Sequence, residues 1–280
     1  MSAVINKRVF LVGCSRSGTT ILQVLIAGHD SIYSFPETFF FIDLNITHIW
    51  QKFLPRRRYG EVLQSVMKRI SREDLISKIP NKSLTYRQAV DLYVCMLDCV
   101  SRESGYAIWL EKSPMHVLYI DEIKKMVPKA HFIHILRDGR DVVASIYDRA
   151  CKYPHRFGFE RNPVIAIDRW NKSLSQSSKY VGISGHSFVL FDKLINNTEG
   201  TLRAICADLN IDFEIKMKNV SESSINVIPS NFHHLEGARR PVGVPESKFT
   251  KLFDSETQKF IESKLHIQGY EALQDKLMRL

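Results

Sequence analysis

The stretch from Val9 to Leu22 reads Val-Phe-Leu-Val-Gly-Cys-Ser-Arg-Ser-Gly-Thr-Thr-Ile-Leu and gives the strongest indication of the fold. Its first four residues are apolar, which is typical of a strand that is buried on both faces in a parallel sheet. The chain then turns between Gly13 and Gly18 and continues with apolar residues at helical spacing. A strand, a glycine-bounded loop and a helix bring loop N–H groups and a helix N-terminus to one point, where both favour an anion.

The two glycines have the spacing of a P-loop, but Thr19 stands where a P-loop NTPase carries the lysine that reaches the β- and γ-phosphates. This loop carries its cation inside, at Arg16. The sequence Gly-Thr-Thr at a helix start places hydroxyl and free N–H groups on the same side. We therefore predict that the loop holds a terminal anionic group without the usual nucleoside triphosphate arrangement. The alternative is an ordinary tight turn with an exposed arginine.

The composition is that of a globular protein with a sizeable core, because 44% of the 280 residues are hydrophobic and 25% are charged. The net charge of +9 suits a polyanionic ligand, an acidic partner or a membrane surface. Apart from Arg56-Arg57-Arg58 the basic residues are dispersed, which argues against a nucleic-acid partner. We expect no transmembrane segment, because no apolar run reaches the roughly 18 residues of a membrane span.

The location that we expect is the cytoplasm. The first strand is predicted to begin by about residue 8, without a preceding secretory signal pattern. The five cysteines form no Cys-x-x-Cys motif, and Cys95 and Cys99 lie one helical turn apart in an apolar pattern. We predict that these two are buried reduced thiols rather than members of a disulfide or a metal site.

The pattern of elements predicts an α/β fold with a mostly parallel, P-loop-like sheet flanked by helices. We predict one domain over residues 1–280, with a helical insertion at about 39–103 that is interrupted at Pro55, Gly60 and Pro80. The predicted strands, after the first, lie at 31–34, 106–110, 131–136 and 187–191. The predicted helices after the insertion lie at 115–127, 140–149, 164–180, 199–209 and 255–265, and loops are expected at 151–163 and 218–245.

Four polar clusters follow the ends of predicted strands, so all four are expected to face one crevice at the carboxyl edge of the sheet. The clusters are the loop at residues 13–20, Glu37, the segment 111–114, and the segment 137–141 together with Ser145 and Arg149. In the last cluster Ser145 and Arg149 lie four residues apart on one helix face and predict a phosphate site with Arg137. The alternative is that Arg137 merely pairs with Asp141 and that Arg149 is solvated.

In combination, these motifs resemble those of sulfotransferases that use 3′-phosphoadenosine 5′-phosphosulfate (PAPS). The similarity is to the subgroup that includes the protein-tyrosine sulfotransferases and many bacterial relatives. The first loop resembles the subgroup's Pro-Arg-Ser-Gly-Thr-Thr, and residues 29–38 resemble its His-Pro-x6-Glu-Thr, with Asp30 in place of proline. The pattern Arg-Asp-Gly-Arg, followed by serine and arginine at the family's spacing, is complete in Arg137, Ser145 and Arg149.

The resemblance implies a role for each matching residue. Arg16, Ser17, Gly18, Thr19 and Thr20 would hold the 5′-phosphosulfate, and Arg137, Ser145 and Arg149 would hold the 3′-phosphate. Glu37 would be the general base, while Arg16 and Lys112 would stabilise the sulfuryl oxygens and the leaving oxygen.

Two later residues of the chain are implied as further contacts of the 5′ end. The segment 246–249 resembles the family's Ser-Lys-Trp, which implies Lys248 as a contact, and Ser224 is implied as another. Phe191 stands where the family often has a tyrosine near the nucleotide.

The resemblance also implies a reaction that the residue types suit. Sulfuryl transfer spreads charge over equatorial oxygens, so cations at Arg16, Lys112 and Lys248 are appropriate, and the Glu37 carboxylate suits proton removal. No metal is expected, because His131 and His134, like the pair His233-His234, lack a supporting ligand set. For Glu37 alone, a helix first-turn carboxylate is the alternative.

The predicted function is therefore transfer of a sulfuryl group from PAPS to a hydroxyl of a small-molecule or peptide acceptor. The alternatives are a P-loop-type kinase and a non-catalytic nucleotide-binding protein. The sequence specifies neither the acceptor, nor the oligomeric state, nor the role of the arginine run at residues 56–58.

Overall fold

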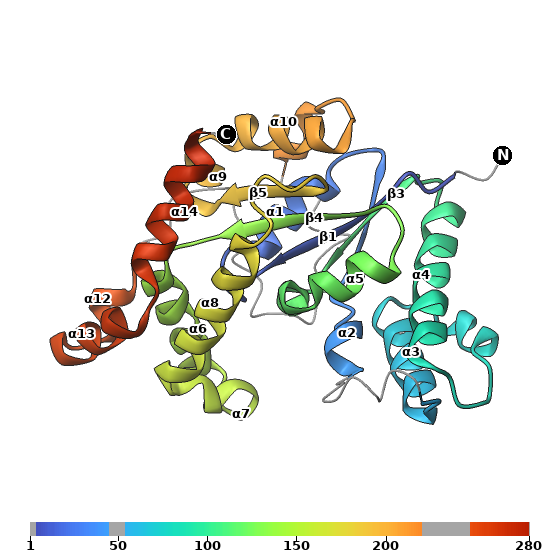
Figure 1. Cartoon of the computed structure of the whole chain (residues 1–280), viewed down its shortest axis with the longest axis horizontal. Coiled ribbons are helices and arrows are strands. Elements are labelled where there is room, and N and C mark those ends of the chain that lie inside the picture. The colour runs from blue at the N-terminus through green and yellow to red at the C-terminus, as the bar shows by residue number, and fades with distance from the viewer. Residues whose placement is uncertain (1–3, 45–53, 220–246, 280) are drawn as a thin grey trace.

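The computed structural model describes residues 4–44, 54–219 and 247–279, and it contains a five-stranded parallel sheet in the order β2-β3-β1-β4-β5 (Figure 1). The strands are β1 (Lys7–Gly13), β2 (Ile32–Phe35), β3 (Ile108–Lys112), β4 (Ala130–Leu136) and β5 (His186–Leu190). The middle strand β1 is apolar on both faces because both are covered by helices, as the run of apolar residues from Val9 predicted.

Helices connect the strands and cover the sheet. The α-helices are α1 (Thr19–Ala27), α2 (Phe40–Asp43), α3 (Arg57–Arg69), α4 (Tyr86–Glu103), α5 (Ile120–Met126), α6 (Gly139–Lys152), α7 (Pro154–Phe157), α8 (Pro163–Ser178), α9 (Phe191–Asn196), α10 (Thr198–Leu209), α12 (Phe249–Leu252), α13 (Ser255–Lys264) and α14 (Ile267–Arg279). The 3₁₀ helices are η2 (Glu73–Lys78), η3 (Pro114–Tyr119), η4 (Gly158–Arg161) and η5 (Ile215–Lys218). Within the described ranges no helix has the length and apolarity to cross a membrane.

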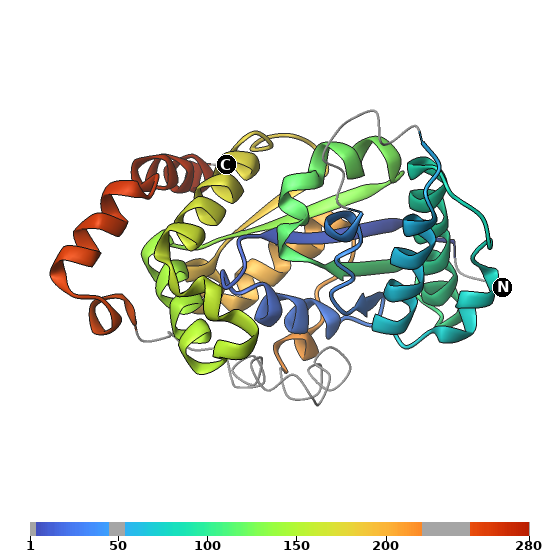
Figure 2. The same cartoon turned by 90° about the horizontal axis from the view of Figure 1, so that it is seen from below.

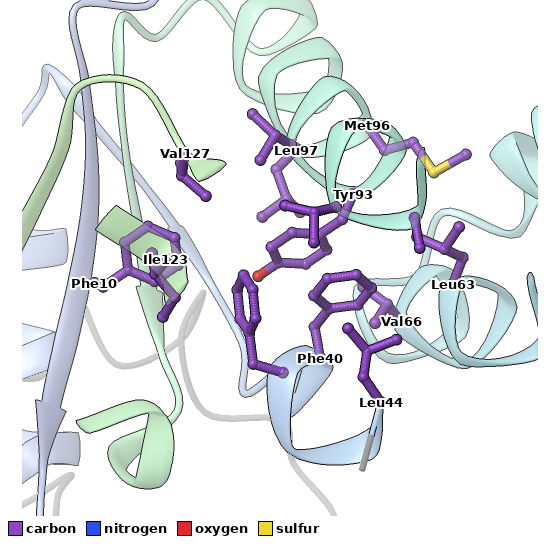
Figure 3. Packing of buried hydrophobic residues seen from close by; sticks show 14 of the residues in the cluster. Phe10, Phe40, Leu44, Leu63, Val66, Tyr93, Met96, Leu97, Ile123 and Val127 are labelled. Atoms are coloured by element: carbon purple, nitrogen blue, oxygen red, sulfur yellow. The ribbon is translucent and has the colours of Figure 1, made fainter. Parts of the chain in front are cut away.

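The helices form two layers with an extension at each end (Figures 1 and 2). On one face, α1, α9 and α10 pack against alternate strand residues such as Leu11 and Ile133. On the other face, Phe10 and Phe132 contact a cluster built from α2, α3, α4, η3 and α5. Helices α6, α8 and α12 to α14 form a third cluster at the β4–β5 end. In the second cluster the Phe40 ring stacks on Tyr93 with centroids 4.0 Å apart (Figure 3).

All five strands run in the same direction, so their carboxyl ends meet at one edge of the sheet. The register pairs Phe10 with Glu111 and Leu11 with Lys112. Because successive side chains alternate between faces, Lys112 lies on the α1 side of the sheet and Glu111 on the α4 side. The four polar clusters of the sequence analysis therefore lie at or just beyond the carboxyl ends of adjacent strands.

Several element boundaries differ from those expected. Gly60 lies buried inside α3 and does not interrupt it, because a single internal glycine costs only about 1 kcal/mol against the packing of the helix. Strand β3 continues through Glu111 and Lys112, since their backbone still pairs with β1. The expected loop at 151–163 contains α7 and η4, and the expected helix at 115–127 divides into η3 and α5. Most of the expected loop at 218–245 lies outside the described residues.

The prediction that Cys95 and Cys99 are buried is wrong. Cys95 is exposed and Cys99 is partly exposed, whereas Cys14 and Cys206 are buried. Residues i and i+4 share one helix face, and the face of α4 that enters the core carries Tyr93, Leu97 and Val100 instead. All five cysteines are free thiols.

Candidate active site

The loop between β1 and α1 forms an anion cradle at the carboxyl edge of the sheet. Its tight path requires positive φ angles at Arg16 (73°) and Gly18 (95°). A Cβ atom on Gly18 would lie 2.4 Å from the Phe191 ring, so glycine is needed for space as well as conformation. Gly18 caps α1 without a side-chain hydrogen bond, and the first turn of α1 carries no acidic residue. Its N–H groups and positive dipole end therefore suit an anionic ligand.

Lys112 joins this cradle to Glu37. It is the last residue of β3, and its side chain is 2% exposed. The Nζ atom forms an ion pair with Oε1 of Glu37 and lies 3.4 Å from Oγ1 of Thr20, to which it donates a hydrogen bond. Glu37 remains 32% exposed, so one buried cation connects the helix start of α1 with a solvent-accessible carboxylate.

Three arginines converge on the opposite side of the cradle. Nε of Arg16 donates to Oγ of Ser145 at 3.2 Å, and Nη1 of Arg137 approaches the carbonyl oxygen of Arg16 at 3.5 Å. Burial, followed by the positive charges of Arg149 and Arg137, lowers the pKa of Arg16 to about 10. Such a concentration of like charge is unfavourable by itself and is stabilised when an anion binds.

Two of these arginines are held by carboxylates but keep buried donor groups without acceptors. Arg137 donates to Oδ2 of Asp141 at 3.1 Å, and Arg149 forms an ion pair with Glu160. The buried Nε atoms of both arginines have no hydrogen-bond partner within the described residues. Because buried polar groups are nearly always paired, these two N–H groups indicate a missing acceptor such as a phosphate oxygen.

The structure brings the two predicted anion sites closer together than expected. Arg16, assigned to the 5′ end, contacts Ser145, assigned to the 3′ end. Arg137 does pair with Asp141, as the alternative proposed, but Arg149 is only 14% exposed and is not solvated. Arg16 thus connects the two predicted sites, because it lies in the loop before α1 and contacts both Ser145 and Arg137.

Lys248 and Ser224 are the two later residues predicted to contact the nucleotide, and only Lys248 lies within the described residues. Lys248 is 47% exposed and forms a 2.5 Å ion pair with Asp148 of α6, so it is not in contact with Lys112 or Glu37. The neighbouring Ser247 donates to Asp141 at 3.1 Å, which places this segment beside α6. Ser224 lies outside the described residues.

Sequence reasoning missed the residues that hold the arginines. Glu160 is buried and binds both Arg149 and Arg169. The Phe157 ring covers the Arg149 guanidinium at 4.1 Å, and the Phe191 ring covers that of Arg137 at 4.4 Å. Phe191 was noted only for its place in the family pattern. No local pattern marks the other residues, because the segment from α7 to η4 has no strong periodicity.

The histidines do not form a metal site in the described parts of the chain, where no group of three potential ligands occurs. His131 contacts Oγ of Ser187 at 2.7 Å, and His134 contacts His186 at 3.0 Å. Burial lowers the pKa of His131 to about 4 and holds that of His134 well below its usual range. These side chains belong to the packing between β4, β5 and α8.

Comparison with known proteins shows which family this sequence and site resemble. A model of the sulfotransferase family matches residues 8–214. The protein-tyrosine sulfotransferase of Drosophila melanogaster is 21% identical over 251 residues, covering 88% of this chain and 44% of the relative. Protein-tyrosine sulfotransferase A of Caenorhabditis elegans is 22% identical over 237 residues, covering 79% and 57%. The chain thus spans about half the length of these curated relatives.

Solved structures share the fold. The sulfotransferase domain from the curacin biosynthetic pathway has a TM-score of 0.57 at 17% identity, covering 94% of this chain and 98% of that domain. The sulfotransferase domain of the Synechococcus PCC 7002 olefin synthase gives 0.53 at 18%, covering 92% and 84%. A mouse sulfotransferase complexed with PAP gives 0.51 at 12%, covering 94% and 84%. These likenesses confirm the predicted P-loop-like sheet. Since the family model spans most of the residues that form the sheet and its polar edge, this chain belongs to the sulfotransferase family.

Proposed function

We propose that this protein transfers the sulfuryl group of PAPS to an acceptor hydroxyl, with Glu37 as general base. The observation that carries the proposal is the position of Lys112, whose Nζ contacts both Glu37 and Thr20. One buried cation thereby lies between the start of α1, where a 5′-phosphosulfate would bind, and a partly exposed carboxylate that can accept a proton. Family membership supports the same reaction.

In the proposed reaction the acceptor O–H loses its proton to the Glu37 carboxylate while its oxygen forms a bond to sulfur. The bond between sulfur and the bridging oxygen breaks, and 3′-phosphoadenosine 5′-phosphate (PAP) leaves with the electron pair. Lys112 and the N–H groups at the start of α1 would stabilise the charge that develops on the bridging and sulfuryl oxygens. Arg16 lies in the loop before α1 and donates to Ser145, so it would interact with both ends of the nucleotide.

The opposite end of the nucleotide would bind at the three arginines. The unpartnered Nε groups of Arg137 and Arg149 and the Ser145 hydroxyl suit a 3′-phosphate. Lys248, whose charge is paired with Asp148, stays a predicted contact of the 5′ end. Ser224 stays a predicted contact, and the cytoplasmic location and the single domain also stay predictions.

The acceptor that we favour is a phenolic hydroxyl of a peptide or small molecule. The two curated relatives are named for tyrosine in proteins. Glu37 is partly exposed, so an acceptor hydroxyl can reach it from solvent.

The test is transfer of radiolabelled sulfate from PAPS to a panel of tyrosine peptides, phenols and aliphatic alcohols. We expect Glu37→Ala to lower kcat by about 10²–10⁴-fold, the usual contribution of a general base. Glu61→Ala is the matched control, because Glu61 is exposed on α3 away from the sheet edge. Equal rates for Glu37→Ala and the wild type would refute the assignment of the base.

A P-loop-type kinase is the second candidate, and the Thr19 position argues against it. Isothermal titration distinguishes the two functions. We expect PAP to bind far more tightly than ATP with magnesium, because the arginine cluster suits a 3′-phosphate. Tighter binding of ATP would favour the kinase. Tight PAP binding without transfer to any acceptor would favour a non-catalytic protein.

A further inference from the structure

The segment that carries Glu37 has little structure of its own. Residues 36–39 lie between β2 and α2 and belong to neither. Helix α2 is a single turn that begins after Phe39, whose φ is 54° and whose side chain makes no capping hydrogen bond. A positive φ at an aromatic residue is uncommon and persists only where surrounding contacts impose it. Something outside the segment must therefore hold it in place.

Glu111 at the end of β3, Ser113 just after it and His116 of η3 accept from backbone N–H groups of this region, and Arg69 of α3 donates to the Thr38 carbonyl oxygen. The Thr38 N–H donates to Oε1 of Glu111 at 3.1 Å, and the Phe39 N–H donates to Oγ of Ser113 at 3.0 Å. The Phe41 N–H donates to Nε2 of His116 at 3.3 Å. The Phe41 N–H belongs to the first turn of α2, which leaves it without an intrahelical partner, and the N–H groups of Thr38 and Phe39 precede that helix, so all three use these acceptors.

The three acceptors also fix one another. Oε1 of Glu111 accepts from the Ser113 hydroxyl and, at 2.9 Å, from the Thr38 hydroxyl, while Oε2 lies 3.0 Å from Nδ1 of His116. Since Nε2 of His116 accepts from a backbone N–H, the ring proton is on Nδ1 and donates to Glu111. The Thr38 proton goes to Glu111, so the Tyr93 hydroxyl must donate to Thr38 across their 3.0 Å contact.

This network is buried, and its carboxylate, Glu111, is ionised. Glu111, Ser113 and His116 are each 0% exposed. Burial raises the pKa of Glu111, but interactions with His116, Ser113 and the Thr38 N–H outweigh that effect, and the net pKa lies below its usual value. Glu111 is therefore ionised at neutral pH and has acceptor oxygens aimed at the backbone next to Glu37.

We propose that Glu111, acting with Ser113 and His116, is a positioning residue that holds the Glu37 carboxylate within reach of the Lys112 ammonium group. The inference rests on the proposed function of Glu37. Glu111 and Lys112 are consecutive on β3 and point to opposite faces of the sheet. Lys112 therefore binds the Glu37 carboxylate, while Glu111 accepts from the backbone N–H of Thr38, the residue after Glu37. Two consecutive residues of one strand thereby position the Glu37 carboxylate and the backbone that follows it.

Glu111→Gln tests the network with little change of volume. An amide in this place has one acceptor oxygen and one NH₂ group. If the amide oxygen keeps the hydrogen bond from the Thr38 N–H, the NH₂ group faces Nδ1 of His116. The imidazole proton must then move to Nε2, and the hydrogen bond from the Phe41 N–H to Nε2 is lost. Either orientation breaks one backbone contact. Asp98→Asn is the matched control, because Asp98 is a buried carboxylate bound to Arg8 and Trp109 at a distance from Glu37.

The first readout is hydrogen–deuterium exchange by mass spectrometry of the full-length protein. We expect Glu111→Gln to accelerate exchange in a peptide covering residues 36–43, while peptides from β4 and α10 exchange as in the wild type. Ser113→Ala, a milder change, should do the same, and Ser113→Thr should restore protection. Unchanged exchange at 36–43 in both Glu111→Gln and Ser113→Ala would overturn the proposal, whether or not an acceptor has been found.

The second readout is a double-mutant cycle in the transfer assay. We expect Glu111→Gln to lower kcat about tenfold, with PAP affinity unchanged and Asp98→Asn without effect on kcat. In the Glu37→Ala background Glu111→Gln should then change the residual rate by less than twofold, because it acts only through Glu37. An equal tenfold loss in both backgrounds would overturn the inference while leaving the proposed function intact. Absence of transfer by the wild type would instead refute the proposed function.

Discussion

Two buried polar clusters flank the carboxyl edge of the sheet, and they differ in how far their hydrogen bonds are satisfied. In the arginine cluster, buried Nε donors of Arg137 and Arg149 lack acceptors within the described residues. In the Glu111 network, each donor from Thr38 and His116 has an acceptor within 3.1 Å. A cluster with surplus donors is prepared for a ligand, whereas a satisfied cluster gives rigidity to the backbone around it.

The difference has an energetic consequence. Removing a member of a satisfied network leaves its partners buried and unpaired, which lowers the free energy of unfolding. Removing an arginine from a cluster of like charges relieves repulsion and loses mainly ligand affinity. Substitutions at Glu111, Arg137 and His131 test whether stability and binding separate in this way.

The largest effect on stability is expected for Glu111→Ala. It leaves the Thr38 N–H and Nδ1 of His116 without an acceptor in a fully buried place, so the free energy of unfolding should fall by about 3 kcal/mol. Urea denaturation followed by circular dichroism measures this loss. A decrease in the free energy of unfolding below about 1 kcal/mol would show that the network contributes little to stability. The contrast with the arginine cluster would then be wrong.

Arg137→Ala should have the opposite profile. We expect PAP affinity to fall by more than tenfold, about 1.4 kcal/mol, with a change in stability of about 1 kcal/mol or less. Titration with adenosine 5′-phosphate, which lacks the 3′-phosphate, is the control and should be nearly unaffected. Equal losses for both nucleotides would remove Arg137 from the proposed 3′-phosphate site.

The smallest effect at neutral pH concerns His131, which is buried on β4 and contacts the Ser187 hydroxyl. The pKa of His131 is about 4 in the folded protein, because of burial, and about 6.5 in the unfolded chain. Between these values the unfolded state binds the extra proton, so stability falls as the pH decreases from 6.5 towards 4, by up to about 1.4 kcal/mol per pH unit. His131→Gln should reduce this slope in denaturation series between pH 7 and 4.5, and an unchanged slope would contradict the prediction.

Much of the candidate site was accessible from local sequence signals. The apolar run before Gly13 predicted β1, and the polar residues after each strand predicted one edge at which they meet. Lys112 and Glu37 were thereby predicted to face the same crevice, and the structure joins them in an ion pair. Both residues lie within the range that the family model matches.

Other features were not predictable from local signals, because their partners are distant in the sequence. Thr38 and Glu111 are 73 residues apart, and Arg16 and Ser145 are 129 residues apart. Glu160 lies in a segment that was expected to be an irregular loop. Its burial against Arg149 depends on how α7 and η4 fold back on α6.

Local sequence patterns were sufficient to place the five strands and the polar residues at their carboxyl ends, because alternation, apolar runs and glycine turns act over a few neighbouring residues. Which of those polar groups are satisfied and which keep unpaired donors became evident only in the folded protein. That distinction depends on burial and on hydrogen bonds between remote segments, and these arise only when the whole sheet and its two helix layers have assembled.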